Sequence, residues 1–401
     1  MNIQKDLLAI TILLSASAIS LPILTSGFLA GQALGFLPAS LCIFIAGSLV
    51  SIIASLSSYI GAKTHKDTLF LAKEYFGTVG IVMVAISLAI ALTGWFAFQL
   101  YCICSTLQTL YVNMPIHLCI FLFGSILILF RLLGIKKIGF IAVICSPPLL
   151  GILVFVATQI STIPDIIHII HPATVLLTIG GLLGTTITAT LELPILYQTI
   201  QQPKQAIISC LSIFGIFIPG LQILGAYIGT ATATDLLPFL VQSLPQGEAT
   251  CALLIIISSM LANILNLYSS SKTVERLIPS LGTTKSTFLA GISGICLARS
   301  PILRNSMVFF SLLTVAAGSL TILFTYTHLQ KIKKTKRSIT PMHALYIWIG
   351  AIIGAFFSQY IPAQNLFINP LLTGIVITTT LVVLIPKKKE RNLTCFLHET
   401  L

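Results

Sequence analysis

Residues 178–194 read TIGGLLGTTITATLELP, and this stretch decides the fold. It lies inside an apolar run at 174–197, yet from Gly180 onward it holds three glycines, four threonines and a proline within fifteen residues. Glycine permits a helix to break in hydrocarbon, and threonine hydroxyls can replace the backbone hydrogen bonds lost there. Many transporters build their binding sites on such broken helices. The stretch therefore predicts a discontinuous membrane helix, with close packing through small residues as the alternative.

A second interrupted stretch lies in the first apolar run of the chain. Residues 15–22 read SASAISLP, and TSG follows at 25–27. Small residues next to a proline again favour a break in the helix. The two interruptions fall in the first and sixth apolar runs, which are corresponding positions in two halves of five. This placement predicts a five-plus-five inverted repeat, followed by two further spans.

The composition predicts an all-α integral membrane protein with little chain outside the bilayer. Of the 401 residues, 56% are hydrophobic and 8% are charged, against roughly 25% charged residues in a soluble domain. Each crossing needs about 20 apolar residues. Twelve apolar runs are present, at 8–30, 36–60, 81–111, 116–130, 138–160, 174–197, 206–230, 249–268, 287–298, 306–327, 345–360 and 366–385.

These runs divide the chain into two parts. We expect residues 1–330 to form a transport core of ten spans, with repeats at about 8–160 and 174–327. Residues 331–401 then supply a loop, spans eleven and twelve, and a short basic tail.

The positions of the basic residues predict the topology. With the N-terminus in the cytoplasm, 20 of the 22 lysines and arginines fall on the cytoplasmic side, and only Arg299 and Arg304 fall outside. One missing or extra span would reverse every later loop and destroy this positive-inside distribution. We therefore expect a multi-pass protein of the plasma (inner) membrane with both termini cytoplasmic. The basic run at 331–337 is then a loop that faces anionic lipid headgroups and not nucleic acid.

Glu192 is the only one of ten acidic residues that lies inside an apolar run. A carboxylate inside the membrane costs at least about 2.5 kcal/mol on insertion scales, so it is a functional candidate by default. Because a low dielectric disfavours the charged form, Glu192 is a candidate proton carrier. The alternative is a carboxylate near the cytoplasmic end that reaches water or a lysine.

Two further helix faces carry polar groups suited to a ligand. Trp95 and Gln99 are four residues apart, so they share one helix face, and an indole beside an amide can stack on and hydrogen-bond a flat heterocycle. Asn263 and Asn266 are three residues apart in the eighth run. Buried amides need partners, either on another helix or on a ligand.

Three motifs, in order along the chain, resemble one transporter family. They are SYIGAKT at 58–64, Gly94-Trp95-Phe96 with Gln99, and NILNLYS at 263–269. The sequence resembles the nucleobase:cation symporter-1 family, and within it the bacterial cytosine permeases of the purine-cytosine permease type. The resemblance implies twelve helices, a leucine-transporter-type core in spans one to ten, and alternating access.

The resemblance also implies roles for individual residues. Trp95 would stack on the substrate ring, while Gln99 and Asn263 would bind the substrate. The carbonyls of Ala16 and Ile19 would help to hold sodium. Gly181 to Thr185, including Leu183, would form the break of the sixth span beside the substrate.

The chain departs from the family pattern in two places. Cytosine permeases place an aromatic residue in the sixth span, where this chain has Leu183 or Thr186. Sodium-coupled members place two hydroxyl residues before the eighth-span asparagine, where this chain has leucine and alanine. Ser258 is nearby but on a different face, and it remains a candidate for ion coupling. Losing two oxygen ligands weakens a hard-cation site. The second departure favours a proton over sodium as the coupling ion, with Glu192 as its carrier.

The sequence thus predicts a symporter that imports a nucleobase such as cytosine or a related flat heterocycle, driven by a proton or sodium gradient and without a cofactor. The runner-up is an amino-acid permease of the same fold. An ion channel is disfavoured because the chain has no ring of like charges and no filter-like loop. An enzyme is disfavoured because HExxH, GxSxG and paired intramembrane carboxylates are all missing.

Overall fold

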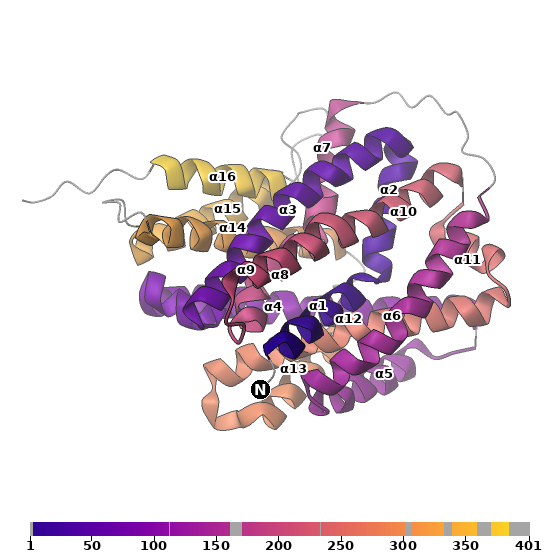
Figure 1. Ribbon diagram of the computed structural model, residues 1–401, viewed down its shortest axis with the longest axis horizontal. Helices are drawn as coiled ribbons and strands as arrows, with labels where there is room; N and C mark the ends of the chain where they lie inside the picture. The colour runs from indigo at the N-terminus through magenta and orange to yellow at the C-terminus, as the bar shows by residue number, and fades with distance from the viewer. Residues whose placement is uncertain are drawn as a thin grey trace, which may run out of the picture.

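The computed structural model describes residues 3–111, 113–160, 171–232, 234–300, 306–332, 339–358 and 370–384. Within these ranges the chain is helical and contains no strand (Figure 1). The helices in chain order are α1 (Ile3–Ala18), α2 (Leu21–Leu34), α3 (Phe36–Thr64), α4 (Thr68–Leu110), α5 (Ile116–Leu132), α6 (Ile135–Thr158), α7 (Pro172–Gly184), α8 (Ile187–Tyr197), α9 (Pro203–Cys210), the π-helix η1 (Leu211–Phe217), α10 (Ile218–Ala231), α11 (Leu236–Ser243), α12 (Gly247–Leu277), the 3-10 helix η2 (Pro279–Leu281), α13 (Gly282–Ala298), α14 (Ser306–Ile332), α15 (Pro341–Ser358) and α16 (Pro370–Leu384).

Each of the twelve predicted apolar runs contains helix. Among the described residues, seven helical segments are long and apolar enough to cross a membrane, and the bent pair α1–α2 makes an eighth. The protein is therefore a multi-pass membrane protein, while the count of twelve crossings and the division at residue 330 stay predictions. The tail after residue 384 and most of the basic run at 331–337 lie outside the described residues.

The first and sixth spans are both interrupted, as predicted. The first breaks at Ile19 and Ser20, where α1 and α2 meet at a 50° bend. The sixth breaks at Thr185 and Thr186, between α7 and α8. The Thr185 hydroxyl donates to the carbonyl of Leu182 at 2.8 Å. A threonine hydroxyl therefore supplies a hydrogen bond beside the break, as the sequence suggested.

The packing of the broken spans follows the predicted repeat. The second half of span one, α2, packs on α10 of span seven, as Figure 1 shows. The second half of span six, α8, packs in the same way on α3 of span two. A Cβ added at Gly27 would collide with the backbone of Gln222. At the other interface, a Cβ added at Gly61 would lie 2.6 Å from the Cα of Pro194. Glycine is thus required at both interfaces, which bring the two breaks together.

Pro194 creates a specific need inside α8. A proline in a helix interior leaves the carbonyl four residues earlier without its N–H donor, and here that carbonyl belongs to Thr190. The Ser57 hydroxyl of α3 donates to it at 2.6 Å. The Thr68 hydroxyl at the start of α4 donates to the next carbonyl, that of Leu191, at 2.8 Å. Side chains of two other helices therefore hold α8 in register.

Replacing Ser57 tests this arrangement. We expect Ser57→Ala to lower the free energy of unfolding by about 1–3 kcal/mol, because it leaves the buried Thr190 carbonyl without a donor. The melting temperature of purified protein in detergent measures the effect. Ser51→Ala is the matched control, because the Ser51 hydroxyl on the same helix donates only to Ser48 of that helix. Equal losses in the two variants would contradict the assignment.

Candidate functional site

A cavity of about 100 Å³ lies where the two helix breaks meet. This volume is well above the ~10–15 Å³ that one water requires. Its lining comes from α1, α2, α4, α8, η1, α10, α12 and the break of span six. The residues that give it polar or aromatic character include Trp95, Gln99, Thr185, Glu192, Phe214 and Asn266.

The predicted pair on the third span faces this cavity. Trp95 and Gln99 of α4 both line it, one turn apart on the same face. The indole meets the ring of Phe98 edge-on, with centroids 6.0 Å apart. The Gln99 Oε1 atom is buried and has no hydrogen-bond partner among the described residues. The pair thus offers a ligand an aromatic surface next to an unused acceptor.

Glu192 lies on the wall of the same cavity and is 3% exposed. Its Oε2 atom and the Thr188 hydroxyl have no hydrogen-bond partner among the described residues. The polar neighbour of the carboxyl group is Ser269 of α12, whose hydroxyl also closes no well-formed hydrogen bond. No ion pair within the described ranges reaches Glu192, so no contact with a lysine is seen there. A buried carboxyl oxygen without a hydrogen-bond partner is poised to take up a proton or to accept a hydrogen bond from a ligand.

The eighth span presents Asn266, rather than Asn263, to the cavity. Ala262, Leu265 and Asn266 of α12 share the lining face. Asn263 is completely buried outside the lining, and neither atom of its amide has a partner in the described part of the chain. A direct contact of Asn263 with substrate stays a prediction, whereas Asn266 is already in place for one.

The sixth span contributes the last residue of the predicted stretch and residues just beyond it. Thr185 lines the cavity, and so do Thr186 and Thr188. Gly181 and Leu183 do not, because they lie within α7 before the break. The break itself lies at Thr185 and Thr186, at the C-terminal end of the stretch that the family resemblance indicated.

A second cavity, of about 20 Å³, lies behind the break of the first span. Ile19 and Ser258, both predicted for ion coupling, line it together with Ser20. The Ala16 carbonyl accepts a hydrogen bond from the Ile19 N–H at 3.2 Å, and the Ser258 hydroxyl donates to Ile255 at 3.3 Å. Most of the other lining side chains are leucines. The site brings Ile19 and Ser258 together, without Ala16, and offers a hard cation few side-chain oxygens.

Hydroxyl groups join three helices beside the cavity. The Ser209 hydroxyl of α9 lies 2.7 Å from that of Thr11 on α1 and 2.6 Å from that of Tyr197 on α8. Thr11 precedes the lining residue Leu14 by about one turn. This triad links α1 and α8, which line the cavity, to α9, which leads into the lining segment η1.

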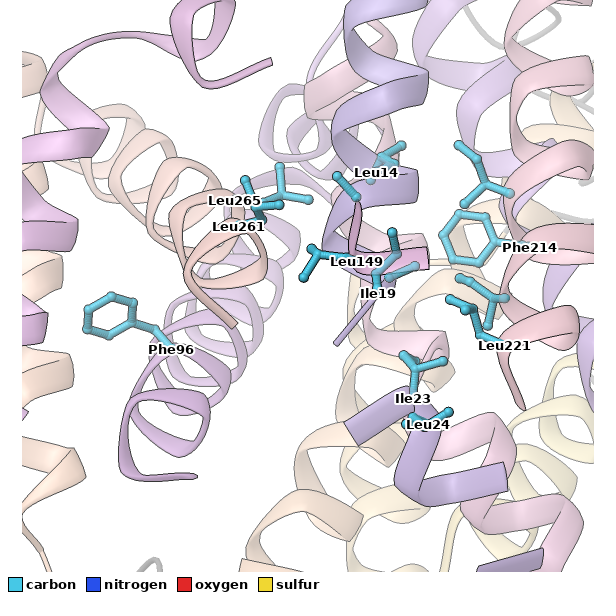
Figure 2. Close-up of a cluster of buried hydrophobic side chains, with 14 of the residues drawn as sticks. Leu14, Ile19, Ile23, Leu24, Phe96, Leu149, Phe214, Leu221, Leu261 and Leu265 are labelled. Carbon is cyan, nitrogen blue, oxygen red and sulfur yellow. The ribbon is translucent and has the colours of Figure 1, made fainter. Parts of the chain in front are cut away.

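Phe214 is an aromatic lining residue that the sequence did not single out. It lies on η1, the π-helical part of span seven, and is 3% exposed. Figure 2 shows its ring pointing from its own helix toward Leu14 and Ile19 of the first span. The chain has 23 phenylalanines, and Phe214 is one that lies within an apolar run. No local signal marks the π-helix that orients it.

Comparison with known proteins gives matches in structure only. No family model matches the sequence, and no curated protein matches it. The structure is similar to that of Mhp1, a nucleobase-cation-symport-1 family transporter in a closed conformation with bromovinylhydantoin bound. The TM-score is 0.69 at 13% identity, over 96% of this chain and 94% of that one.

Two other transporters show the same architecture. A Na+-coupled sialic acid symporter in a substrate-bound outward-open state has a TM-score of 0.70 at 15% identity, over 96% of this chain and 91% of that one. A manganese transporter from Eremococcus coleocola has a TM-score of 0.56 at 15% identity, with 96% and 94% of the chains covered. At these low identities the structural similarity shows the fold alone: the chain has the helical architecture of the nucleobase-cation-symport-1 transporter Mhp1, as its sequence motifs suggested.

Proposed function

We propose that the protein is a secondary active transporter that carries a planar heterocycle, such as a nucleobase, across the membrane by alternating access. The observation that carries the proposal is the cavity at the meeting point of the two helix breaks, with Trp95 and Gln99 on one wall. Broken spans that meet at mid-membrane are the usual site of substrate binding in this architecture. The fold shared with Mhp1, whose structure holds bromovinylhydantoin, supports the same reading.

The chemistry of the cavity favours a solute without a negative charge. Its lining contains one ionisable side chain, Glu192, and no lysine, arginine or histidine of the described chain. A carboxylate on the solute would face this acid without a basic partner. The runner-up, an amino-acid permease, draws support from α2 and α8, whose N-termini begin at the cavity and suit an anion. Glu192 opposes that reading.

Proton coupling through Glu192 is the proposed driving mechanism. The carboxyl group lies in the cavity itself, without a basic partner in the described residues. The second cavity, by contrast, is lined largely by leucine side chains. A proton needs one titratable group, whereas a hard cation needs several oxygens. This distribution of oxygens supports a proton over sodium.

The contacts of the loops support the proposed orientation, with both termini in the cytoplasm. Lys66, after span two, and Lys331, after span ten, both pair with Glu74, at 2.6 and 3.3 Å. Arg276, after span eight, pairs with Asp67 at 2.9 Å. Spans two, eight and ten therefore end on one side, which is rich in basic residues, as the positive-inside rule requires of the cytoplasmic face.

Trp95→Ala tests the identity of the solute. We expect it to lower the affinity for planar bases about tenfold or more, because base–aromatic stacking is worth about 1–3 kcal/mol. Thermal-shift titration of purified protein with bases, nucleosides and amino acids measures this. Trp348→Ala is the control, since Trp348 lies on α15 and donates to Ala316 outside the cavity. Stabilisation by amino acids alone, unchanged by Trp95→Ala, would establish the runner-up instead.

Glu192→Gln tests the coupling. We expect wild-type proteoliposomes to accumulate substrate when the outside is more acidic, because Glu192 loads a proton there and releases it inside. The glutamine variant cannot titrate, so it should exchange substrate across the membrane without accumulating it. Radiolabelled uptake and counterflow measure the two activities. The exposed Glu248→Gln serves as control. Wild-type uptake that followed a sodium gradient and ignored a pH gradient would refute proton coupling.

A further inference from the structure

We propose that Phe214 is a specificity-determining residue whose ring contacts the planar face of the transported solute. The sequence places no aromatic residue at the break of the sixth span, so only Trp95 was expected to contact a ring. The structure supplies another aromatic side chain to the same cavity from span seven. This inference rests on the proposed function and assigns a role to one wall of the cavity.

The two helix breaks let a residue of span seven reach the cavity. Phe214 lines it together with Ser17, Ala18 and Ile23 of the first span and Ala189 of the sixth. A continuous helix in place of either broken span would separate η1 from the part of the cavity that α4 lines. Leu14 and Ile19 lie beside the ring in Figure 2. In the sequence they flank Ser17 and Ala18, which line the cavity. The breaks thus open a path from span seven to the solute.

The π-helix sets the direction of the ring. Segments of π-helix are rare, interrupt α-helices, and are frequently found at functional sites. Here η1 interrupts α-helix on both sides, between α9 and α10. Phe217, three residues further on the same segment, is half-buried and does not line the cavity. The irregular segment therefore selects Phe214 alone of its two phenylalanines.

Phe214 differs in its surroundings from a phenylalanine that only fills the core. Phe96, next to Trp95, is 1% exposed and packs against Gly294, where an added Cβ would collide with its ring. Phe96 does not line the cavity, and in Figure 2 it lies apart from the Phe214 group. Among the described residues no aromatic ring stacks on Phe214. A ligand ring would thus meet no competing aromatic partner there.

The test compares planar and saturated rings in matched variants. Trp348→Phe leaves Trp95 as the single tryptophan of a chain with two, so its fluorescence reports binding in the cavity. The probes are cytosine, uracil, hypoxanthine and hydantoin, with 5,6-dihydrouracil as the saturated partner of uracil. We expect Phe214→Leu to raise the Kd of planar probes about tenfold, as loss of one stacking contact should. The Kd of 5,6-dihydrouracil should change less than twofold.

Three further variants separate contact from packing. Phe214→Tyr keeps the ring and should keep the preference for planar probes. Phe96→Leu and Phe217→Leu remove the same atoms elsewhere and should leave every Kd within twofold. An equal loss for planar and saturated probes in Phe214→Leu, or the same loss in Phe96→Leu, would overturn the proposal. If wild-type protein binds none of the bases, the proposed function itself fails and this assignment fails with it.

Discussion

The structure depends on one constraint: backbone N–H and C=O groups in hydrocarbon must find partners within the protein. Continuous helices meet this requirement over most of the chain. Regular helical hydrogen bonding stops at two breaks, Ile19–Ser20 and Thr185–Thr186. A threonine hydroxyl supplies a hydrogen bond beside the second break. Pro194 removes one helical hydrogen bond at a third point, and there the Ser57 hydroxyl donates to the carbonyl that lacks its partner. A polar cavity can form at the breaks because some backbone groups there are not committed to a helix.

Close packing then fixes where the breaks meet. Gly27 against Gln222, and Gly61 against Pro194, bring helix backbones together at two related interfaces. Because each half of the predicted repeat supplies one broken span and one packing partner, the arrangement holds both breaks beside α4 and α12. The site is therefore a consequence of how the bundle packs, and its polar residues need only occupy the right faces.

Much of this could be predicted from the sequence, because the signals were local. Runs of apolar residues predicted the helices, and glycine, threonine and proline inside two of them predicted the breaks. The four-residue spacing of Trp95 and Gln99 predicted a shared helix face, and in the structure this face lines the cavity. Helix phase alone could not choose between Asn263 and Asn266, because residues three apart lie close in angle. Phe214 was out of reach, since its orientation depends on a π-helix and on gaps in two other spans.

The positions of the oxygens connect the site to its energetics. At the second cavity Ser258 and Ser20 are the hydroxyl side chains among mostly leucines, so a desolvated cation would regain few of the contacts it has in water. At the main cavity Glu192 is a single acid with the hydroxyl groups of Thr188 and Ser269 nearby. Burial without a cationic partner penalises its charged form, and any group that shares the proton or donates to the carboxyl group relieves that penalty. A solute bound in this cavity would lie against Glu192, the proposed proton carrier. Binding of the solute and binding of the proton would then depend on the same few atoms, which is the simplest way for this architecture to make one drive the other.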